Sequence, residues 1–285
     1  MKLASYRVRG RESFGGVVGD GVVDLKLRLA PRYDSAIELL RTDGGLDAAR
    51  AAVRGVRPDF PVSEIEWLPP ILAPEKILCV GINYANRNAE FGDAETPAYP
   101  SLFFRVPGSL VGHRQPIMRP CESEQLDYEA EIALVIGRAG RRIAPADALG
   151  HVAGVTLCNE GTVRDWLRHG KFNVTPGKNF DASGSMGPWI VTTDEIDLAQ
   201  PLHLTAKVNG ELTQDDTTLS MIKSFAELIA YASSFMTLKA GDIVVTGTPV
   251  KLKHGEGALW LKPGDTIEIE VPEIGILHNT VVANS

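Results

Sequence analysis

Apolar residues recur along most of the chain with the spacing of β-strands. From about residue 75 onward, short apolar and β-branched runs alternate with segments rich in Gly and Pro, a pattern typical of strands and turns. The runs cover residues 76–81, 102–105, 129–136, 152–157, 189–192, 204–208, 242–246 and 266–271. Many strands with few helices predict a mainly β domain with some α, rolled or barrel-like in shape.

One later segment has the period of a helix. Its apolar residues recur at spacings of three and four, which places them on one face of a helix over 220–235. They are Ile222, Phe225, Leu228, Ile229 and Phe235. We predict that Ser220 is the N-cap of this helix, because a serine hydroxyl can accept a hydrogen bond from a backbone amide of the first turn.

The first 70 residues have a different organisation. Strand-like segments at 3–7, 15–18 and 21–25 come first, and helical segments around 35–41 and 46–56 follow. The pair Pro69-Pro70 then interrupts the pattern. We predict a small N-terminal α+β domain over residues 1–70 and a larger domain over 71–285.

Composition narrows the functional class. Hydrophobic residues make up 44% and charged residues 23% of the chain, as in ordinary globular proteins, and the net charge is −7. No basic block of five or more residues occurs, so nucleic acid is not an expected partner. No apolar stretch approaches the length of a membrane span or a signal peptide, so we expect no membrane association and a cytoplasmic location. The three cysteines form no CxxC pair, which argues against a thiolate zinc site.

Two carboxylates lie on one face of a predicted strand. Glu129 and Glu131 are one residue apart, and strand side chains alternate between faces, so both project the same way. The apolar residues that follow indicate a buried strand. Burying an ionised carboxylate without a partner costs roughly several kcal/mol, which a cation between the two would remove. Oxygen ligands favour Mg²⁺, Mn²⁺ or Ca²⁺ over Zn²⁺; the alternative is an edge strand with both side chains in solvent.

Three more groups stand at strand ends or in loops. Glu160 follows the apolar run 152–157 after Cys158 and Asn159 and could supply a third carboxylate. Asp165 could do so too, although it is as well suited to pair with Arg164 or to cap the next turn. Lys178 follows Pro176-Gly177 and is either solvated or directed at a ligand. Thr248 follows Gly247, whose missing side chain would let a ligand approach closely. Taken alone, the Lys178 and Thr248 loops are each more typical of an ordinary turn.

Together and in this order, the segments resemble the fumarylacetoacetate hydrolase family. The matching pieces are Val80-Gly81-Ile82-Asn83-Tyr84, Tyr128-Glu129-Ala130-Glu131, Asn159-Glu160-Gly161-Thr162-Val163-Arg164-Asp165, Gly177-Lys178-Asn179-Phe180 and Gly247-Thr248-Pro249. They cover roughly residues 75–280. The resemblance implies a mixed β-sandwich roll as the catalytic domain, a small variable N-terminal domain and assembly as a homodimer.

The resemblance also implies a metal site. A Mg²⁺ or Mn²⁺ ion is held in the family by two Glu and one Asp, and Glu129 and Glu131 match the two Glu. Glu160 stands where the family usually has Asp. Its extra methylene moves the carboxylate outward, so either the backbone adjusts or the contact runs through water.

Further positions match groups that face the substrate. Lys178 is similar to the active-site lysine of the family, and Thr248 is similar to the threonine that binds the substrate carboxylate. Arg105 falls where members often carry a Lys or Arg that faces the substrate. Tyr84, in the first matching segment, is a further candidate for substrate binding.

One departure concerns the base that activates water. Many hydrolases of the family carry a His and, three residues later, a Glu on a short helix over the site. Here Arg87 occupies the His position and Glu90 remains. Arginine cannot accept a proton near neutral pH, so Arg87 is expected to pair with Glu90 or to bind a second substrate carboxylate. Glu90, His169 or His113 would then have to serve as the base.

The chemistry that the resemblance implies is metal-assisted. A small 2-oxo acid would be polarised by the ion, an enolate would be stabilised, and Lys178 and Arg105 would neutralise further charge. We expect hydrolytic C–C cleavage of a 2,4-dioxo acid of the acylpyruvate type, in the catabolism of aromatic or sugar acids. The alternatives are an isomerase or decarboxylase of the 2-hydroxyhepta-2,4-diene-1,7-dioate type and a non-enzymatic, metal-stabilised binding protein.

Overall fold

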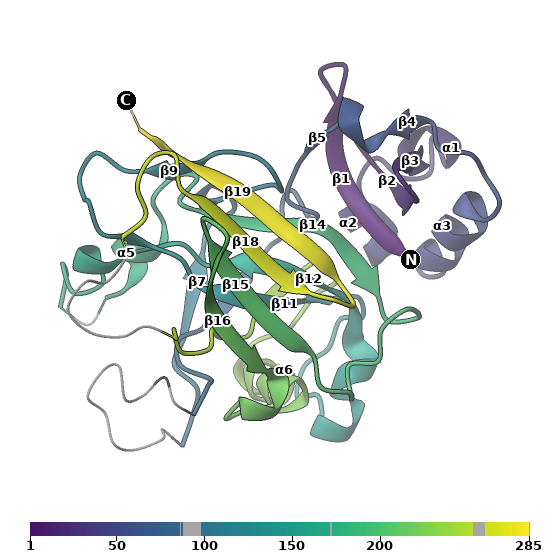
Figure 1. Cartoon of the computed structure of the whole chain (residues 1–285). Helices are drawn as coiled ribbons and strands as arrows, with labels where there is room; N and C mark the ends of the chain where they lie inside the picture. The colour runs from purple at the N-terminus through teal and green to yellow at the C-terminus, as the bar shows by residue number, and fades with distance from the viewer. Residues whose placement is uncertain (86, 88–97, 172, 253–259, 285) are drawn as a thin grey trace.

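A large twisted sheet organises the chain. The computed structural model describes residues 1–85, 87, 98–171, 173–252 and 260–284, and within them a twelve-stranded sheet runs through the molecule (Figure 1). Ten of these strands follow one another in the order β4 (Phe60–Pro61), β3 (Gly21–Asp24), β2 (Arg11–Val18), β1 (Lys2–Val8), β14 (Gly184–Thr192), β12 (Val152–Asn159), β11 (Ala130–Ile136), β17 (Ile243–Val245), β6 (Ile77–Val80) and β7 (Leu102–Arg105). β5 (Glu66–Trp67) pairs with β1, and β8 (Leu110–Val111) pairs with β14.

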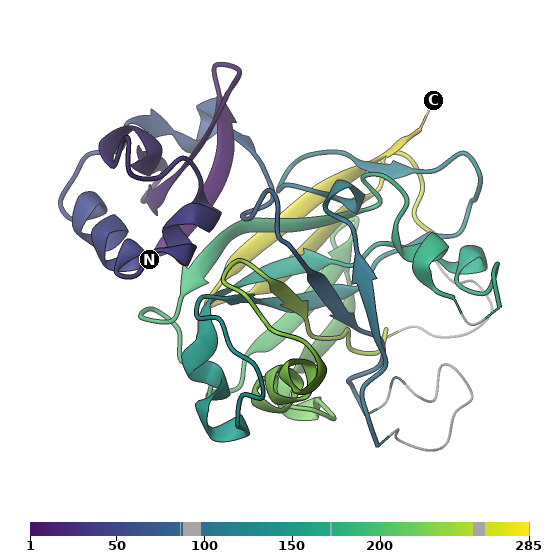
Figure 2. The ribbon, with the colours of Figure 1, turned by 180° about the vertical axis from the view of Figure 1, so that it is seen from behind.

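A smaller sheet covers one face of the large one. Its order is β16 (Glu211–Thr217), β15 (His203–Val208), β18 (Thr266–Val271), β19 (Gly275–Ala283) and β9 (Ile117–Arg119). The short strands β10 (Leu126–Asp127) and β13 (Thr162–Val163) form a separate pair. The small sheet lies in front of the large one in Figure 1 and behind it in Figure 2, so the two form layers.

The main core lies between these layers. Ile132 and Leu134 of β11 are fully buried there against Leu204 of β15 and Ile267 and Ile269 of β18. Alternate residues of β11 point the other way, into a second core on the opposite face of the sheet. Because β11 is buried on both faces, its apolar run is continuous rather than alternating. The predicted mainly β, layered fold is confirmed.

The helices are short and lie outside the sheets. Among the described residues they are α1 (Leu25–Arg28), α2 (Ala36–Arg41), α3 (Gly45–Val53), α5 (Thr175–Lys178) and α6 (Phe225–Phe235). The described 3₁₀ segments are η1 (Val62–Glu64), η2 (Pro107–Ser109), η3 (Pro145–His151), η4 (Arg164–Trp166) and η5 (Thr218–Ser220). Among the described residues, no helix is both long and apolar enough to cross a lipid bilayer.

The prediction for helix α6 was partly wrong. Ser220 belongs to η5, and the N-cap is Ser224, whose hydroxyl accepts from the Glu227 amide while the Glu227 carboxylate accepts from the Ser224 amide. This reciprocal arrangement is a capping box, which a second serine four residues further along the chain satisfies. Phe235, predicted to lie on the buried stripe, is half exposed at the C-terminal end of the helix.

The N-terminal segment continues the large sheet. β1 pairs with β14 at Lys2–Val191 and Leu3–Ile190, and Leu3 shares the second core with Ala133 and Val135 of β11. A domain boundary near residue 70 therefore stays a prediction. β16 and β19 are among the strands that were not predicted, and β16 is an edge strand that consists mostly of polar residues.

Candidate active site

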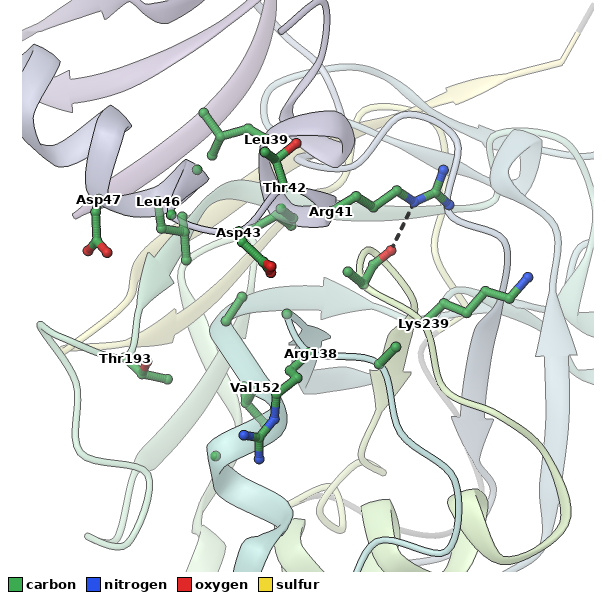
Figure 3. Close-up of a pocket in the computed structure, with 18 of the residues that line it drawn as sticks. Leu39, Arg41, Thr42, Asp43, Leu46, Asp47, Arg138, Val152, Thr193 and Lys239 are labelled. Carbon is green, nitrogen blue, oxygen red and sulfur yellow. Dashed lines mark hydrogen bonds between the residues drawn. The ribbon is translucent and has the colours of Figure 1, made fainter. Parts of the chain in front are cut away.

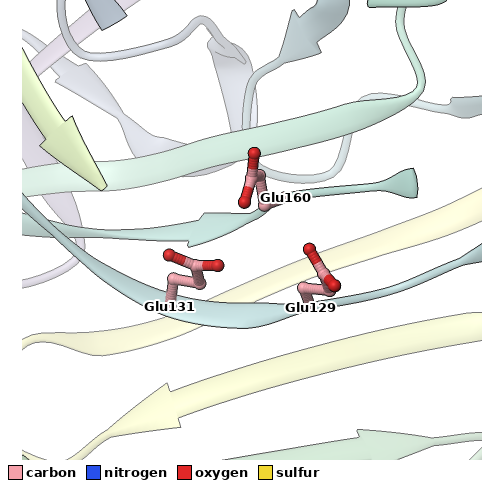
Figure 4. Close-up of side chains that lie close together, drawn as sticks. All are labelled: Glu129, Glu131 and Glu160. Atoms are coloured by element: carbon pink, nitrogen blue, oxygen red, sulfur yellow. The ribbon is translucent and has the colours of Figure 1, made fainter. Parts of the chain in front are cut away.

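Three buried carboxylates converge at one end of two neighbouring strands. Glu129 directly precedes β11, Glu131 is its second residue, and Glu160 directly follows β12. The antiparallel register pairs Ala130 with Asn159, and the Glu160 amide donates to the Glu129 carbonyl at 2.8 Å, so these two glutamates lie opposite each other. One carboxylate oxygen of each glutamate lies within 4.8 Å of the others. Figure 4 shows all three side chains extending into the same space.

Glu129 is surrounded by positive charge. Lys178 donates to its Oε2, and Arg87 and Arg164 donate to its Oε1 at 2.9 and 2.7 Å. Burial of Glu129 opposes ionisation, but the cations Lys178, Arg164 and Arg87 outweigh it and hold its pKa well below the usual value. Glu129 is therefore ionised across the physiological pH range.

Glu131 and Glu160 have fewer partners. Glu131 Oε2 accepts from the Gly247 amide at 2.5 Å. Burial, followed by the negative charges of Glu160 and Glu129, raises the pKa of Glu131 well above its usual value. Both carboxylate oxygens of Glu160 are buried without a hydrogen-bond partner among the described residues. Two undersatisfied carboxylates facing a third are the donor set that a hard divalent cation requires, so these residues fit a Mg²⁺ or Mn²⁺ ion.

Lys178 reaches this cluster from the short helix α5. Its Nζ lies 3.3 Å from Glu160 Oε2 as well as against Glu129, and it stands 5.1 Å from the centre of the Phe103 ring. The pKa of Lys178 is lowered by burial but raised more by Glu129 and Glu160, with a net rise. Gly177 allows this approach, since a Cβ there would lie 2.7 Å from the Val163 carbonyl oxygen. The site thus contains a buried ammonium beside the carboxylates.

Arg105 lies beside the cluster rather than free to face a ligand. Its guanidinium donates to the Gly161 carbonyl at 2.7 Å and to the carbonyl and hydroxyl of Ser109 and the hydroxyl of Ser183. Its Nη1 is 3.9 Å from Glu160 Oε1. These bonds hold the backbone just after Glu160. The predicted contact between Arg105 and a substrate stays a prediction.

Thr248 and Tyr84 lie near Glu131. Thr248 stands one residue after Gly247, whose amide binds Glu131, and its hydroxyl oxygen accepts from Gln214 Nε2 at 2.9 Å. Burial and the charge of Glu131 raise the pKa of Tyr84, and the Tyr84 hydroxyl has no hydrogen-bond partner among the described residues. Both hydroxyls are therefore placed where an oxygen-rich ligand could use them.

Of Arg87 and Glu90, which match the family's His and Glu positions, only Arg87 is described. Arg87 is buried and contacts Glu129, whereas Glu90 lies outside the described residues. The alternative bases are used elsewhere: His169 stacks on Trp166, and His113 accepts from the His278 amide. Burial lowers the pKa of His113 to about 4.

A second ion-pair group adjoins the cluster and was not predicted from the sequence. Arg164 bridges Glu129 and Asp127, donating to Asp127 Oδ2 at 2.7 Å, and Lys251 contacts Asp127 Oδ1. The predicted alternative ligand Asp165 instead accepts from Ser123 and is exposed. Asp127 is two residues before Glu129, the same strand period that identified the Glu129–Glu131 pair, and this spacing was the available signal.

A separate groove lies beyond the other end of β11, where Gly137 and Arg138 follow the strand. It has a volume of about 640 Å³ and is lined by α2, α3 and the segments around Arg138 and Lys239 (Figure 3). Arg41 donates there to the Ala240 carbonyl. None of the three glutamates lines this groove, so the chemistry of the cluster is not located there.

Known proteins share this chain's sequence and fold. The family model described as fumarylacetoacetate (FAA) hydrolase C-terminal matches residues 76–282. Oxaloacetate tautomerase Fahd2a, mitochondrial, of Rattus norvegicus is 37% identical over 268 residues, which cover 93% of this chain and 85% of the relative. A probable 2-hydroxyhepta-2,4-diene-1,7-dioate isomerase from Mycobacterium abscessus has 30% identity and a TM-score of 0.81, covering both chains fully.

A third comparison includes a metal. Maleylpyruvate hydrolase from Sphingobium sp. SYK-6, solved in complex with manganese(II) ion and pyruvate, has 27% identity and a TM-score of 0.82, with both chains fully covered. Fold and site together define a divalent-metal enzyme, and Glu129, Glu131 and Glu160 form a cluster that could hold the ion. The chain belongs to the fumarylacetoacetate hydrolase family, as its sequence motifs predicted.

Proposed function

We propose that this enzyme interconverts the keto and enol forms of a small 2-oxo dicarboxylic acid of the oxaloacetate type. The observation that carries the proposal is Arg87, a buried cation at the site in the position of the expected histidine. Hydrolysis requires a base that activates water, and an arginine cannot be that base, so Glu90 would have to activate water without a histidine. Enolisation activates no water, and it requires only stabilisation of a negative oxygen and one group that carries a proton. The tautomerase relative supports this choice.

The charges of the site support a dianionic substrate. One contiguous group contains four acids, Asp127, Glu129, Glu131 and Glu160, and five basic side chains, Arg87, Arg105, Arg164, Lys178 and Lys251. Among the described residues the basic side chains of this group therefore outnumber the acidic ones by one. A divalent cation would add two positive charges, and a dicarboxylate would bring two negative charges. A buried site with an excess of positive charge thus favours a substrate with two carboxylates over one with a single carboxylate.

Each carboxylate has a proposed receptor. The carboxylate next to the 2-oxo group would accept a hydrogen bond from the Thr248 hydroxyl. The distal carboxylate would accept a hydrogen bond from Arg87, which donates to Glu129 in the structure. Arg164, which also donates to Glu129, would continue to hold Glu129 in place. Bidentate guanidinium–carboxylate pairs are among the strongest hydrogen-bonded pairs in proteins.

The proposed reaction transfers one proton between C3 and the 2-oxo oxygen, while the double bond shifts between C2=O and C2=C3. A bound Mg²⁺ or Mn²⁺ ion would supply a Lewis acid that polarises the 2-oxo group. The Lys178 ammonium would stabilise the negative oxygen of the enolate. In the keto-to-enol direction C3 loses a proton and the 2-oxo oxygen gains one, the reverse direction undoes both changes, and Glu90 is the predicted group that carries the proton. Tyr84 and Arg105 remain predicted substrate contacts.

Hydrolysis of an acylpyruvate is the second candidate. The similarity to maleylpyruvate hydrolase favours it, and both reactions would pass through an enolate.

The assembly as a homodimer and the cytoplasmic location also stay predictions. Several of the tautomerase relatives are named as mitochondrial.

The test is a comparison of two products. Enol-oxaloacetate and a panel of acylpyruvates are incubated with protein loaded with Mg²⁺ or Mn²⁺ and, as a control, with EDTA. Enol absorbance follows tautomerisation, and a coupled assay follows pyruvate release. We expect metal-dependent loss of enol absorbance without pyruvate. Pyruvate release from acylpyruvates without acceleration of the keto–enol conversion would favour the hydrolase, and turnover of neither would favour a binding protein.

Two variants separate the proposed roles. Lys178→Met should lower kcat by roughly a hundredfold or more, as loss of one preorganised donor does in other enzymes. Arg87→Met should raise KM for oxaloacetate by at least about tenfold, since a buried charged pair is lost. The KM of a monocarboxylic 2-oxo acid should change little in Arg87→Met. An equal rise for both substrates would contradict the assignment of Arg87 to the distal carboxylate.

A further inference from the structure

Gln214 connects the metal-binding strand to the Thr248 loop. It is fully buried in β16, the edge strand of the smaller sheet. Its Oε1 accepts from the Ala130 amide at 3.2 Å, and Ala130 stands between Glu129 and Glu131. Its Nε2 donates to Thr248 Oγ1 at 2.9 Å and to the Pro249 carbonyl at 2.5 Å. One side chain thus contacts the strand of two metal ligands and a predicted substrate receptor.

The side-chain amide of Gln214 takes the place of a hydrogen-bond partner that β17 does not provide to β11. β17 pairs with β11 opposite Ala133–Val135, and at the end nearer the glutamates the Thr246 amide and hydroxyl both donate to the Ile132 carbonyl, at 3.1 and 2.8 Å. The chain then turns at Gly247, where φ is +99° and a Cβ would meet Asn83. Beyond this turn the Ala130 amide lacks a partner in β17. A buried N–H without a partner is costly, and the Gln214 side chain supplies the acceptor from the other sheet.

These contacts determine which way the amide points. The Ala130 N–H requires the side-chain oxygen, and the Pro249 carbonyl requires the NH₂ group. A flipped amide would face donor with donor and acceptor with acceptor. The Nε2 therefore donates to Thr248, whose hydroxyl oxygen accepts, and the hydroxyl proton must point away from Gln214. Among the described residues no group accepts this proton.

We propose that Gln214 is a positioning residue that presents the Thr248 hydroxyl as a hydrogen-bond donor to the carboxylate of a 2-oxo acid. The inference rests on the proposed function, in which Thr248 receives that carboxylate. A hydroxyl that rotates freely can turn a lone pair toward an anion, whereas one whose oxygen already accepts from an amide offers its proton. Gln214 also ties this donor to the backbone between Glu129 and Glu131, so donor and metal ligands keep a fixed separation.

The experiment measures two affinities. Calorimetry gives the affinity of oxalate for Mn²⁺-loaded protein, and electron paramagnetic resonance gives the affinity of Mn²⁺ without oxalate. Gln214→Met keeps the length of the side chain and removes its hydrogen bonds, and Thr248→Val removes the hydroxyl. We expect each to weaken oxalate binding about tenfold, in line with loss of one charged hydrogen bond, while Mn²⁺ affinity stays within about twofold. Thr248→Ser, which keeps the hydroxyl, should bind oxalate nearly as the native chain does.

The double variant distinguishes positioning from general support of the fold. If Gln214 acts through the hydroxyl, Gln214→Met should add little in the Thr248→Val background. The proposal would be overturned if the double variant lost oxalate affinity by the product of the two single losses. It would also be overturned if Gln214→Met lost Mn²⁺ affinity as much as oxalate affinity.

A second variant guards against misfolding of Gln214→Met. Gln214→Glu retains the acceptor for the Ala130 amide but would attract the proton of the Thr248 hydroxyl. It should therefore weaken oxalate binding more when residue 248 is the native threonine than in the Thr248→Val variant. Equal losses in the two backgrounds would count against the proposal.

The proposed function can fail separately. Absence of oxalate binding to the native Mn²⁺-loaded protein, or unchanged binding in Thr248→Val, would remove the substrate carboxylate from this site. Normal oxalate binding in both Gln214 variants, with weakened binding in Thr248→Val, would overturn the role of Gln214 alone.

Discussion

Replacing Glu131 by Gln should stabilise the metal-free protein and abolish its stabilisation by metal. Glu131 is buried beside two other carboxylates, and its described hydrogen bond comes from the Gly247 amide. Burial of an ion costs several kcal/mol, and a charged hydrogen bond returns about 1.5–3 kcal/mol. The remaining penalty is about 2 kcal/mol. A neutral amide of the same shape would avoid it and could still accept from Gly247.

The effect should be visible as a crossing of melting temperatures. For a chain of this size, 1 kcal/mol corresponds to roughly 2–3 °C. In EDTA at pH 7 we expect Glu131→Gln to melt about 4–6 °C above the native protein. With Mn²⁺ at a hundred times its Kd, binding stabilises the native protein by about 2.7 kcal/mol, or roughly 5–8 °C. The variant should gain almost nothing.

The pH dependence follows from the sign of the pKa shift. The folded state raises the pKa of Glu131 above its unfolded value, so the fold favours the protonated form. The stability from that proton is fully present below the unfolded pKa of about 4.3 and is lost as pH rises through the folded pKa. The native protein in EDTA should therefore lose stability relative to Glu131→Gln as pH increases from about 4.

A matched control and two outcomes complete the test. Glu270 is a partly exposed strand residue, and Glu270→Gln should change neither melting temperature nor metal response. If Glu131→Gln melted below the native protein in EDTA, the claim that the buried Glu131 carboxylate destabilises the metal-free fold would be refuted. An equal Mn²⁺ shift in native protein and variant would refute the role of Glu131 as a ligand.

Three further predictions concern the lid, the support of Glu160 and a helix cap. Arg87→His should raise acylpyruvate hydrolysis if the base is what the native chain lacks, and an unchanged rate across a panel of acylpyruvates would mean that the lid works differently. Arg105→Met should lower the free energy of unfolding in denaturant by about 3–5 kcal/mol, because the Gly161 and Ser109 carbonyls lose buried charged donors. A change below about 1 kcal/mol would show that other contacts hold the backbone after Glu160. Ser224→Ala should cost about 1 kcal/mol by loss of the α6 cap, whereas Ser220→Ala should not, and equal costs would contradict the assignment of the cap.

Periodicity along the chain was sufficient for the local features. Alternation on one strand predicted that Glu129 and Glu131 share a face, and the buried apolar run after them predicted a central strand. These predictions succeeded because strand geometry alone determines which side chains project together. The order of the short motifs was sufficient for the family.

Contacts between distant segments were decided by the tertiary structure. The register of β11 on β12 brings Glu160 opposite Glu129, and no local pattern encodes that pairing. Arg164 lies against Asp127 and Glu129 instead of its neighbour Asp165, because a buried carboxylate gains more from an ion pair than an exposed one.

Gln214 shows the same limit most clearly. In the sequence it is one polar residue among several in a mostly polar segment, with no motif around it. Its role arises because the end of β17 leaves a backbone amide of β11 unpaired at the place where the second sheet passes. The sequence by itself determined which residues carry charge and which face of a strand they share. Only the folded chain decided which of those groups meet, since burial and hydrogen-bond satisfaction depend on segments far apart in the chain.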